Sequence, residues 1–315
     1  MSQTSSRVLI LKHGSLGDIF LMLGALQDIA EHVGSSVDVL TMAPYAKLFK
    51  RSPFVDQVYI DNRKSRFNLG YLYGLRQVLN SKNYEQIIDL QNSKRTLFYR
   101  RFLAPAKNWC QLGTVAPTEF HSAHTDSPVM AKFEAQLSRC GCSTERLLDG
   151  DLGWLSEQTS SSLKVHECDK SVVLLPGASA KHSHKIWPRY AELARLLLEA
   201  GYSVFVAPGP DDMDLCRSIP GELALNDGRW LDFFQLAGVL EKADFVVGND
   251  SGPTHLAASL GTPGLALFSE RTAQYSPNMK RRNMDVRISS ELSEISARSV
   301  FDQIRSSVET KGLDQ

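Results

Sequence analysis

A loop suited to chemistry follows the first apolar run of the chain, residues 8–11, and reads KHGSLGD from Lys12 to Asp18. A helical pattern begins directly after it, so the loop would present the free N–H groups of a helix start, which favour an anionic or polar group. Asp18 has two interpretations. It is either a first-turn carboxylate that stabilises the helix, or a general base that takes a proton from a hydroxyl nucleophile. The spacing of Gly14 and Gly17 differs from the GxGxxG pattern of dinucleotide enzymes.

A second loop of small residues reads LLPGAS at residues 174–179 and continues to KIWP at residues 185–188. Pro188 stands where proline is favoured at the start of a helix. Lys185, just before that start, would oppose the positive end of the helix dipole. An anionic ligand facing both would remove the conflict, and a solvated lysine is the alternative. We expect Trp187 to pack in the core.

The third loop, GNDSGPTH from Gly248 to His255, has the strongest signal for anion binding. A strand-like run enters it, and a helix is expected to begin at Pro253. Free N–H groups of Ser251, Gly252 and the first helical turn would then bind a diphosphate with help from the helix dipole. His255 is either a core histidine or a donor that faces the ligand.

The elements that must hold these loops alternate between short apolar runs and amphipathic stretches. In the first half we expect strands at 8–11, 37–40, 57–60 and 86–90, and helices at 19–30, 44–50, 71–79, 96–103 and 129–140. In the second half we expect strands at 171–175, 203–207, 244–247 and 264–268, and helices at 188–200, 211–218, 232–242, 253–260 and 290–308. This alternation predicts doubly wound α/β sheets with parallel strands. A polar stretch between residues 143 and 170 predicts two domains, 1–150 and 151–315, with a cleft between the carboxyl ends of their sheets.

The formal net charge of zero, from 35 Lys and Arg against 35 Asp and Glu, hides an uneven distribution. Residues 1–150 carry 18 basic and 13 acidic side chains, and residues 151–315 carry 17 and 22. The five cysteines are odd in number and form no CxxC pair, so we expect reduced thiols and neither a disulfide framework nor a zinc site. A signal-peptide pattern and a run of 18 apolar residues are both absent from the sequence. We therefore expect a cytoplasmic protein without a nucleic-acid partner, whose contact with the inner face of the cytoplasmic membrane would be peripheral.

Together these loops resemble those of glycosyltransferase family 9, which contains the ADP-heptose:lipopolysaccharide heptosyltransferases. The resemblance covers almost the whole chain. It rests on SLGD at residues 15–18, DLQNS at 89–93, PGAS at 176–179 with KIWP at 185–188, and NDSGPTHLAA at 249–258 with GTP at 261–263. It implies a GT-B fold, in which an N-terminal Rossmann-like domain takes the acceptor and a C-terminal one takes the nucleotide sugar. It also implies inverting transfer without a metal or another cofactor, and we expect the final helix to pack back on the first domain.

Position by position, the resemblance assigns Asp18 as the catalytic base and Lys185 as the catalytic lysine that holds the donor phosphates. The donor-binding residues are then Gly177, Ser179, Lys185, Asp250, Ser251, Gly252, Pro253, Thr254 and His255. The acceptor-side residues are Lys12, Gly17, Arg63, Lys64, Arg66, Gln91, Lys94 and Arg95. The implied donor is ADP-L-glycero-D-manno-heptose, and the implied acceptor is a phosphorylated lipid A–Kdo core. The basic side chains of the first half suit such a membrane-anchored, anionic acceptor.

Three features depart from the family pattern. Ser269-Glu270-Arg271 stands where Gly-Pro-Thr is frequent, and Asn92 stands where glycine is common. The loop with His121 and His124 has no counterpart and lacks a third metal ligand, so we expect both at the surface. The first departure motivates an alternative, a family member with another nucleotide sugar or a protein or glycan acceptor. A separate alternative is a nucleotide-sugar-binding protein without turnover, or a nucleotide-dependent α/β enzyme of another kind.

Overall fold

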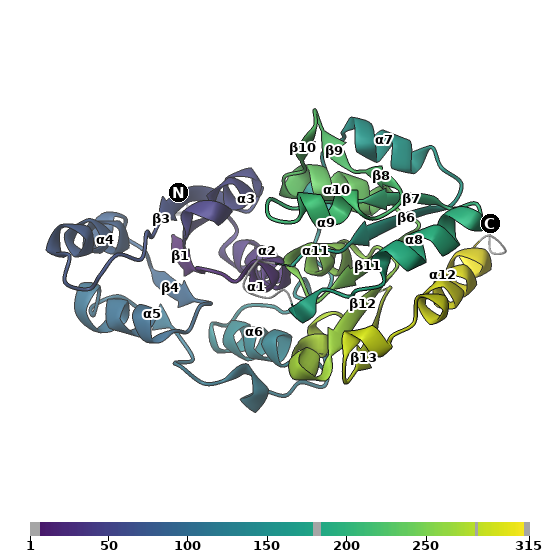
Figure 1. Cartoon of the computed structure of the whole chain (residues 1–315). Coiled ribbons are helices and arrows are strands. Elements are labelled where there is room, and N and C mark those ends of the chain that lie inside the picture. Colours follow the sequence, from purple (N-terminus) through teal and green to yellow (C-terminus); the bar gives the residue numbers. More distant parts are fainter. Residues whose placement is uncertain (1–6, 179–183, 281–282, 312–315) are drawn as a thin grey trace. The chain divides into compact units, whose positions relative to one another are not determined.

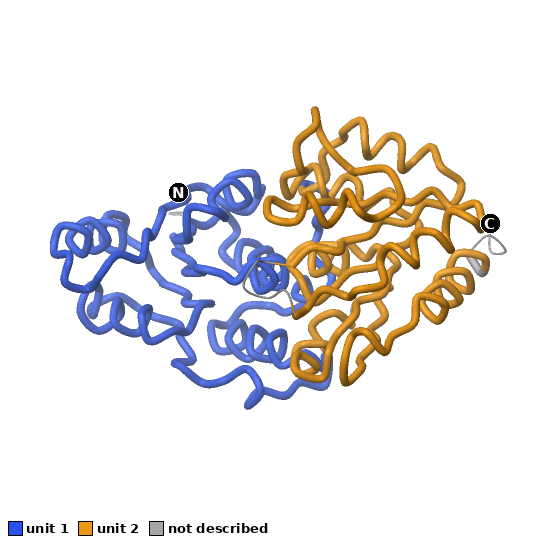
Figure 2. The backbone as a smooth tube through the Cα atoms, viewed as in Figure 1, with its two compact units in different colours: residues 1–154 blue, residues 155–315 orange. Residues whose placement is uncertain are grey.

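Each half of the chain is built around a parallel β-sheet, as the alternation of strands and helices predicts (Figure 1). The computed structural model describes residues 7–178, 184–280 and 283–311 of the 315-residue chain. Two compact units comprise residues 1–154 and 155–315 (Figure 2). The division falls after Trp154, whereas the sequence pattern places it after residue 150. Within the described residues, no helix is long and apolar enough to cross a bilayer.

The first unit has five parallel strands in the order β3-β2-β1-β4-β5. They are β1 (Val8–Leu11), β2 (Val37–Thr41), β3 (Val55–Ile60), β4 (Gln86–Asp89) and β5 (Trp109–Cys110). The α-helices are α1 (Leu16–Leu21), α2 (Leu23–Val33), α3 (Ala46–Arg51), α4 (Leu69–Ser81), α5 (Lys94–Phe98) and α6 (Pro128–Arg139). Every residue of the central strand β1 is buried. Because the strands are parallel, the loops after β1, β3 and β4 leave the sheet at one edge, where ligands of such folds bind.

Two helices of the first unit differ from the sequence pattern. The helix expected at residues 19–30 is two helices, α1 and α2, which meet at Met22. The helix expected at residues 96–103 is α5 followed by a π-helical segment, η2 (Tyr99–Leu103).

One expectation about the cysteines is wrong, because Cys110 and Cys140 form a disulfide. Cys110 ends the edge strand β5, and Cys140 is the C-cap of α6. The two are 30 residues apart in sequence, so the packing of a helix beside a strand pairs them and no local spacing signals it. Cys142, Cys168 and Cys216 are free thiols.

The second unit has six parallel strands in the order β13-β12-β11-β6-β7-β8 and a separate β9-β10 hairpin. The strands are β6 (Ser171–Leu175), β7 (Ser203–Val206), β8 (Glu222–Leu223), β9 (Leu225–Asn226), β10 (Arg229–Trp230), β11 (Phe245–Asn249), β12 (Gly264–Ser269) and β13 (Met284–Ser289). The α-helices are α7 (Ser160–His166), α8 (Tyr190–Glu199), α9 (Met213–Arg217), α10 (Phe233–Lys242), α11 (Gly252–Leu260) and α12 (Ala297–Lys311). β6 and β11 are wholly buried neighbours at the centre of the sheet.

The second unit differs from the sequence pattern in strands β8, β9, β10 and β13, in helix α7 and in the packing of α12. The serine-rich stretch interpreted as a connection contains α7, whose first turn is capped by the Thr159 hydroxyl. Strand β13 extends the sheet beyond β12. The final helix α12 packs on α8, and its Val300, Phe301 and Ile304 belong to the core of this unit. Its apolar face is thus buried within its own unit, and the expectation that the helix also packs back on the first domain stays a prediction.

Candidate active site

Asp18 lies in the first turn of α1, directly after the loop that leaves β1. The Ser15 backbone N–H donates to Asp18 Oδ2 at 3.3 Å, so the carboxylate does cap its own helix. The side chain of Asp18 is nevertheless 36% exposed. A carboxylate that is held on one side and open on the other satisfies the geometric needs of both interpretations, helix capping and proton acceptance.

Lys12, assigned to the acceptor side, is buried and lies beside Asp18. Its Nζ is 3.7 Å from Asp18 Oδ2 and 5.3 Å from the centre of the Phe133 ring. Burial lowers the pKa of Lys12, while the negative charges of Asp18 and Asp89 act in the opposite direction. Lys12 is therefore an internal partner of the candidate base, with only 4% of its surface exposed.

A buried carboxylate, Asp61, organises the loop region of the first unit, and sequence reasoning missed it. It accepts hydrogen bonds from the Tyr99 hydroxyl at 2.6 Å, from the Tyr71 hydroxyl and from the Arg63 backbone N–H at 2.7 Å. His13 Nε2 lies 2.9 Å from its Oδ2. Burial raises the pKa of Asp61, but the hydrogen bonds from His13, Tyr71 and Tyr99 outweigh it and hold that pKa well below its usual range. Because His13 belongs to the loop that leads to Asp18, Asp61 fixes the position of that loop.

Arg95 joins the same network from α5. Its guanidinium donates to the Tyr99 hydroxyl, to the Tyr71 hydroxyl at 3.0 Å and to the backbone carbonyl of Lys64 at 2.7 Å. The side chain predicted to meet the acceptor is thus engaged in internal contacts. The other basic residues assigned to the acceptor side are exposed, namely Arg63, Lys64, Arg66 and Lys94.

The loop after β4 is linked to the Asp18 loop through Gln91. Its Oε1 accepts the His13 backbone N–H at 2.9 Å. Asn92 adopts a left-handed backbone with φ 48°, which explains why glycine is common there and why asparagine is tolerated. The Asn92 side chain donates to Gln136 at 2.6 Å and accepts the Leu112 N–H at 2.8 Å. Asparagine at residue 92 is therefore compatible with a left-handed conformation, which favours glycine.

In the second unit, Lys185 and Asp250 form an ion pair with Nζ 2.6 Å from Oδ2. Their side chains are 20% and 9% exposed. The conflict expected between Lys185 and a helix dipole does not arise, because α8 begins at Tyr190 and not at Pro188. The Asp250 carboxylate is the anionic partner of Lys185, a role that the sequence argument gave to a ligand.

Asn249, also missed as a functional residue, ties three loops together at the end of β11. It is fully buried. Its Oδ1 accepts the Trp187 backbone N–H and the Tyr190 hydroxyl, both at 3.1 Å, and its Nδ2 donates to the Pro176 carbonyl at 2.7 Å. This one amide therefore fixes the loop that carries Lys185 relative to the loop that carries Asp250. Trp187 is buried in the core as expected.

Asp250, Ser251 and Gly252 lead into α11, whose N-cap is Ser251. The first N–H groups of such a helix lack partners inside the helix, which suits an anion. Thr254 is fully buried, and a Cβ at Gly248 would fall 2.2 Å from its Oγ1. In this structure the Thr254 side chain packs against the strand and is not open to a ligand. His255 is also buried.

Packing also explains why residue 177 is a glycine, because a Cβ at this position would lie 1.6 Å from Asp212 Oδ2. The remaining donor-side residue, Ser179, lies outside the described residues. At the neighbouring strand β12, Ser269 is buried and Glu270 is exposed where the segment η6 (Glu270–Asn278) begins. Since β12 pairs with β11 in parallel, Glu270 leaves the sheet at the same edge as Asp250.

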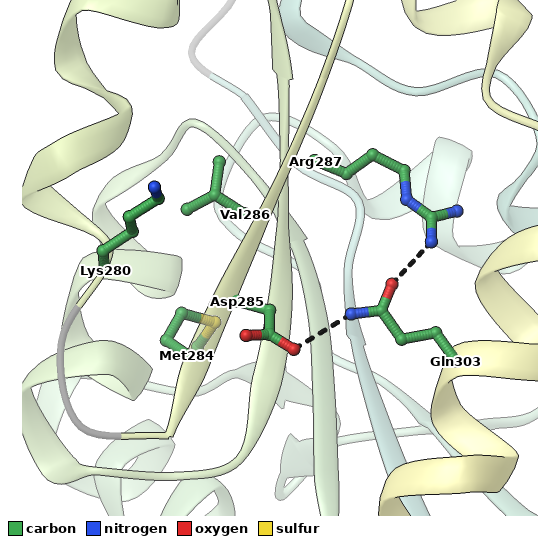
Figure 3. Close-up of a pocket in the computed structure, with 6 residues that line it drawn as sticks. All are labelled: Lys280, Met284, Asp285, Val286, Arg287 and Gln303. Atoms are coloured by element: carbon green, nitrogen blue, oxygen red, sulfur yellow. Dashed lines mark hydrogen bonds between the residues drawn. The ribbon is translucent and has the colours of Figure 1, made fainter.

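No group of three metal-ligating side chains occurs in the part of the chain that the structure describes. His124 is exposed and its Nδ1 lies 2.6 Å from Glu134. A cavity of about 630 Å³ beside the edge strand β13 contains none of the predicted site residues (Figure 3). There, Gln303 accepts from Arg287 at 2.7 Å and donates to Asp285 at 3.0 Å. These polar groups satisfy one another, so we place the site at the β11 loop instead.

The chain resembles proteins of known classification over nearly its whole length. The model of glycosyltransferase family 9 (heptosyltransferase) matches residues 72–304. Lipopolysaccharide heptosyltransferase 2 of Escherichia coli K12 is 22% identical over 319 residues, which cover 90% of this chain and 88% of that protein. Lipopolysaccharide heptosyltransferase 1 of Pseudomonas aeruginosa is 28% identical over 294 residues, which cover 83% and 78%.

Solved structures show the same fold. The Escherichia coli heptosyltransferase WaaC with ADP matches with a TM-score of 0.73 and 21% identity, covering 96% of this chain and 99% of that one. The family 9 glycosyltransferase of Veillonella parvula matches with a TM-score of 0.75 and 16% identity, covering 98% and 99%. The fold class, two parallel-sheet α/β units of the GT-B type, is thereby confirmed. Since the family model spans well over half of the sequence, the chain belongs to glycosyltransferase family 9, the heptosyltransferases.

Proposed function

We propose that this glycosyltransferase moves a heptose from ADP-heptose to a hydroxyl group of the phosphorylated inner core of lipopolysaccharide. The observation that carries the proposal is the pairing of Lys185 with Asp250 beside the first turn of α11. Asp250 holds the Lys185 ammonium group, which is 20% exposed, beside the helix N–H groups, and a bound diphosphate would replace Asp250 as its anionic partner. Two further observations support it. The relatives named above are lipopolysaccharide heptosyltransferases, and WaaC has been solved with ADP and with ADP-2-deoxy-2-fluoro heptose.

The chemistry follows from the groups at the two loops. The acceptor hydroxyl oxygen attacks the anomeric carbon from the face opposite the nucleotide, and its proton passes to the Asp18 carboxylate. The bond between that carbon and the diphosphate oxygen breaks, and its electron pair stays on the diphosphate. Lys185 and the N–H groups of Ser251 and Gly252 stabilise the new charge. The configuration inverts, because one displacement occurs from the opposite face. As the family resemblance implies, these residues act without a metal or another cofactor.

An exposed indole adds a feature suited to a nucleobase. Trp230 is 46% exposed and lines a cavity of about 610 Å³ with Arg229 and Asp232. Asp232 is the N-cap of α10, which leads into β11, so the cavity lies toward the carboxyl edge of the sheet. Stacking of a base on an aromatic face stabilises binding by about 1–3 kcal/mol. We therefore include Trp230 in the proposed donor site.

The exposed Glu270 at the same edge favours an alternative, in which the enzyme takes another nucleotide sugar or a protein or glycan acceptor. Calorimetry with ADP-heptose, UDP-sugars and GDP-sugars separates the two. We expect ADP-heptose to bind most tightly, and tighter binding of a UDP- or GDP-sugar would contradict the proposed donor. A transfer assay with the best binder and a lipid A–Kdo acceptor then tests turnover. Absence of transfer would favour a nucleotide-sugar-binding protein.

A further inference from the structure

Five large apolar side chains are exposed on α4, on the loop before it, on α5 and on η2 of the first unit. Phe67, just before α4, is 92% exposed, and Leu69 and Tyr73 of α4 are 77% and 65% exposed. Leu97 of α5 and Phe102 of η2 are 41% and 55% exposed. Single exposed apolar residues are ordinary on soluble proteins, but a group of this size on neighbouring elements marks an interaction surface. We call these five residues the α4–η2 patch.

Several contacts bring the members of the patch onto one surface. α4 packs against η2, and Asn80 of α4 donates to the Leu103 carbonyl at 3.2 Å. Figure 1 shows α4 and α5 as neighbouring helices of the first unit. Leu69 and Tyr73 are one helical turn apart and so share a face of α4.

The loop before α4 is joined to the α5 side by ring contacts. The Arg66 guanidinium lies 5.1 Å from the centre of the Phe98 ring, and that ring is 5.0 Å from the Phe102 ring. Arg95 also donates to the Lys64 carbonyl at 2.7 Å. These contacts place the segment before α4, which contains Phe67, beside α5 and η2.

The charge around the patch has one sign. Residues 62–84 and 90–107 contain ten Lys and Arg and no Asp or Glu. Of the acidic residues that border these segments, Asp61 and Asp89 are fully buried and Glu85 is exposed. The exposed cations are Arg63, Lys64, Arg66, Arg76, Lys94, Arg100 and Arg101. An apolar centre rimmed by cations matches the surface of a bilayer that contains anionic lipids.

We propose that the α4–η2 patch binds the surface of an anionic phospholipid bilayer. Phe67, Leu69 and Phe102 enter the interfacial region, while the surrounding cations contact headgroup phosphates. A second copy of the chain fits poorly, because it would bring two strongly basic surfaces together. A nucleic acid would engage the cations but would leave Leu69 and Leu97 without an apolar partner. The inference rests on the proposed function in one respect. A lipid-anchored acceptor is found at such a surface, and this gives the membrane binding a purpose.

Sedimentation of the full chain with lipid vesicles tests the proposal. We expect binding to vesicles of phosphatidylcholine mixed with phosphatidylglycerol, weaker binding to phosphatidylcholine alone, and weakening by salt. The triple variant Phe67→Ser, Leu69→Ser, Phe102→Ser should lower partitioning by about tenfold or more. Arg76→Glu should weaken binding to the anionic vesicles only. The control Leu163→Ser, Leu198→Ser removes two leucines of the second unit that are 48% and 43% exposed, and it should bind as the unaltered chain does.

The outcomes that overturn the proposal are distinct from failure of the proposed reaction. Equal binding to both vesicle types, or unchanged binding by a triple variant with an unaltered far-ultraviolet spectrum, would overturn it. So would a loss of self-association in the triple variant, measured by analytical ultracentrifugation without lipid, if vesicle binding stayed the same. With a water-soluble acceptor oligosaccharide the triple variant should retain turnover, and it should lose turnover only with acceptor embedded in vesicles. Absence of heptose transfer to either acceptor would instead reject the proposed function, while vesicle binding would still be decided by sedimentation.

Discussion

The loops of the two units are held in place by different kinds of buried group. In the first unit, an ionised carboxylate, Asp61, gathers hydrogen bonds from the loop before Asp18, from α4 and from η2. In the second unit, a neutral amide, Asn249, connects the loops that carry Lys185 and Asp250. Both groups are fully buried. The same task, fixing loops at the carboxyl edge of a parallel sheet, is thus performed once by a charge and once by a dipole.

The difference affects how each site responds to its environment. A buried carboxylate stabilises the fold only while it is ionised and fully hydrogen-bonded. An amide offers both a donor and an acceptor and does not titrate. The candidate base region should therefore be sensitive to acid, whereas the donor-side loops should be much less so. Four predictions follow. The first two concern the reactive groups of the two units, and the last two test the contrast between the charged and the neutral buried group.

The largest expected effect is on turnover when Asp18 is changed to Asn. The variant cannot accept a proton, so kcat should fall by about 10³, within the range found for general bases. Donor affinity, measured by calorimetry, should be nearly unchanged, because Asp18 lies in the other unit from the donor-side loops. Asp126→Asn alters an exposed carboxylate of the same unit and serves as the control. Normal turnover by Asp18→Asn would remove this residue from the role of base.

Next in size is the effect of Lys185→Ala. It removes the cation that faces the departing diphosphate and leaves Asp250 without its partner, so kcat/KM should fall by about 10²–10³. Lys242→Ala, an exposed lysine of the same unit, is the control. If Lys185→Ala changed only the donor affinity and left kcat intact, Lys185 would bind the donor without stabilising the transition state.

The third prediction concerns stability. Asp61→Asn should lower the free energy of unfolding by about 3 kcal/mol near neutral pH, because it disrupts a buried hydrogen-bonded charge. The pKa of Asp61 is depressed in the folded protein. Its contribution is therefore present above the unfolded value of about 3.9 and is lost as the pH falls from there through the folded pKa.

Urea unfolding of both proteins at a series of pH values measures this. The difference in unfolding free energy should be constant above about pH 5 and should shrink in more acidic solution. A difference that does not change with pH would mean that Asp61 acts through packing and not through its charge.

The smallest expected effect belongs to Asn249→Ala. It leaves the Trp187 N–H and the Pro176 carbonyl without their partner and should cost about 2 kcal/mol of stability. In contrast to Asp61→Asn, the loss should not vary with pH between about 5 and 8. Urea unfolding across that range provides the measurement. A clear dependence on pH would contradict the contrast between a charged and a neutral anchor.

The elements of the fold could largely be predicted, because their signals are local. The buried runs at β1, β6 and β11 read directly as strands, and α10 and α11 begin and end within a residue or two of expectation. The misses have local causes too. Serine at the start of α7 competes with helix formation unless it caps the helix, and the two-residue strand β5 is too short to show an alternating pattern.

The candidate site was predicted only in part. Asp18 and Asp250 were identified in loops that follow strands, and Lys185 was identified as a cation before an expected helix start, but their partners were not identified. Asp61 lies 38 residues from Tyr99, and nothing in the intervening pattern connects them. Asn92 departs from the family pattern, and only the structure shows that its backbone is left-handed.

The sequence by itself determined the order of strands and helices and, through parallel strands, the edge of each sheet at which the functional loops leave. That information is local, since side-chain periodicity and turn residues act over a few positions. The tertiary structure alone decided which groups meet. Lys185 pairs with Asp250 across 65 residues, and Cys110 bonds Cys140 across 30. Such pairs form because packing of whole elements brings them within reach, and no local pattern records the distance between residues that are far apart in the chain.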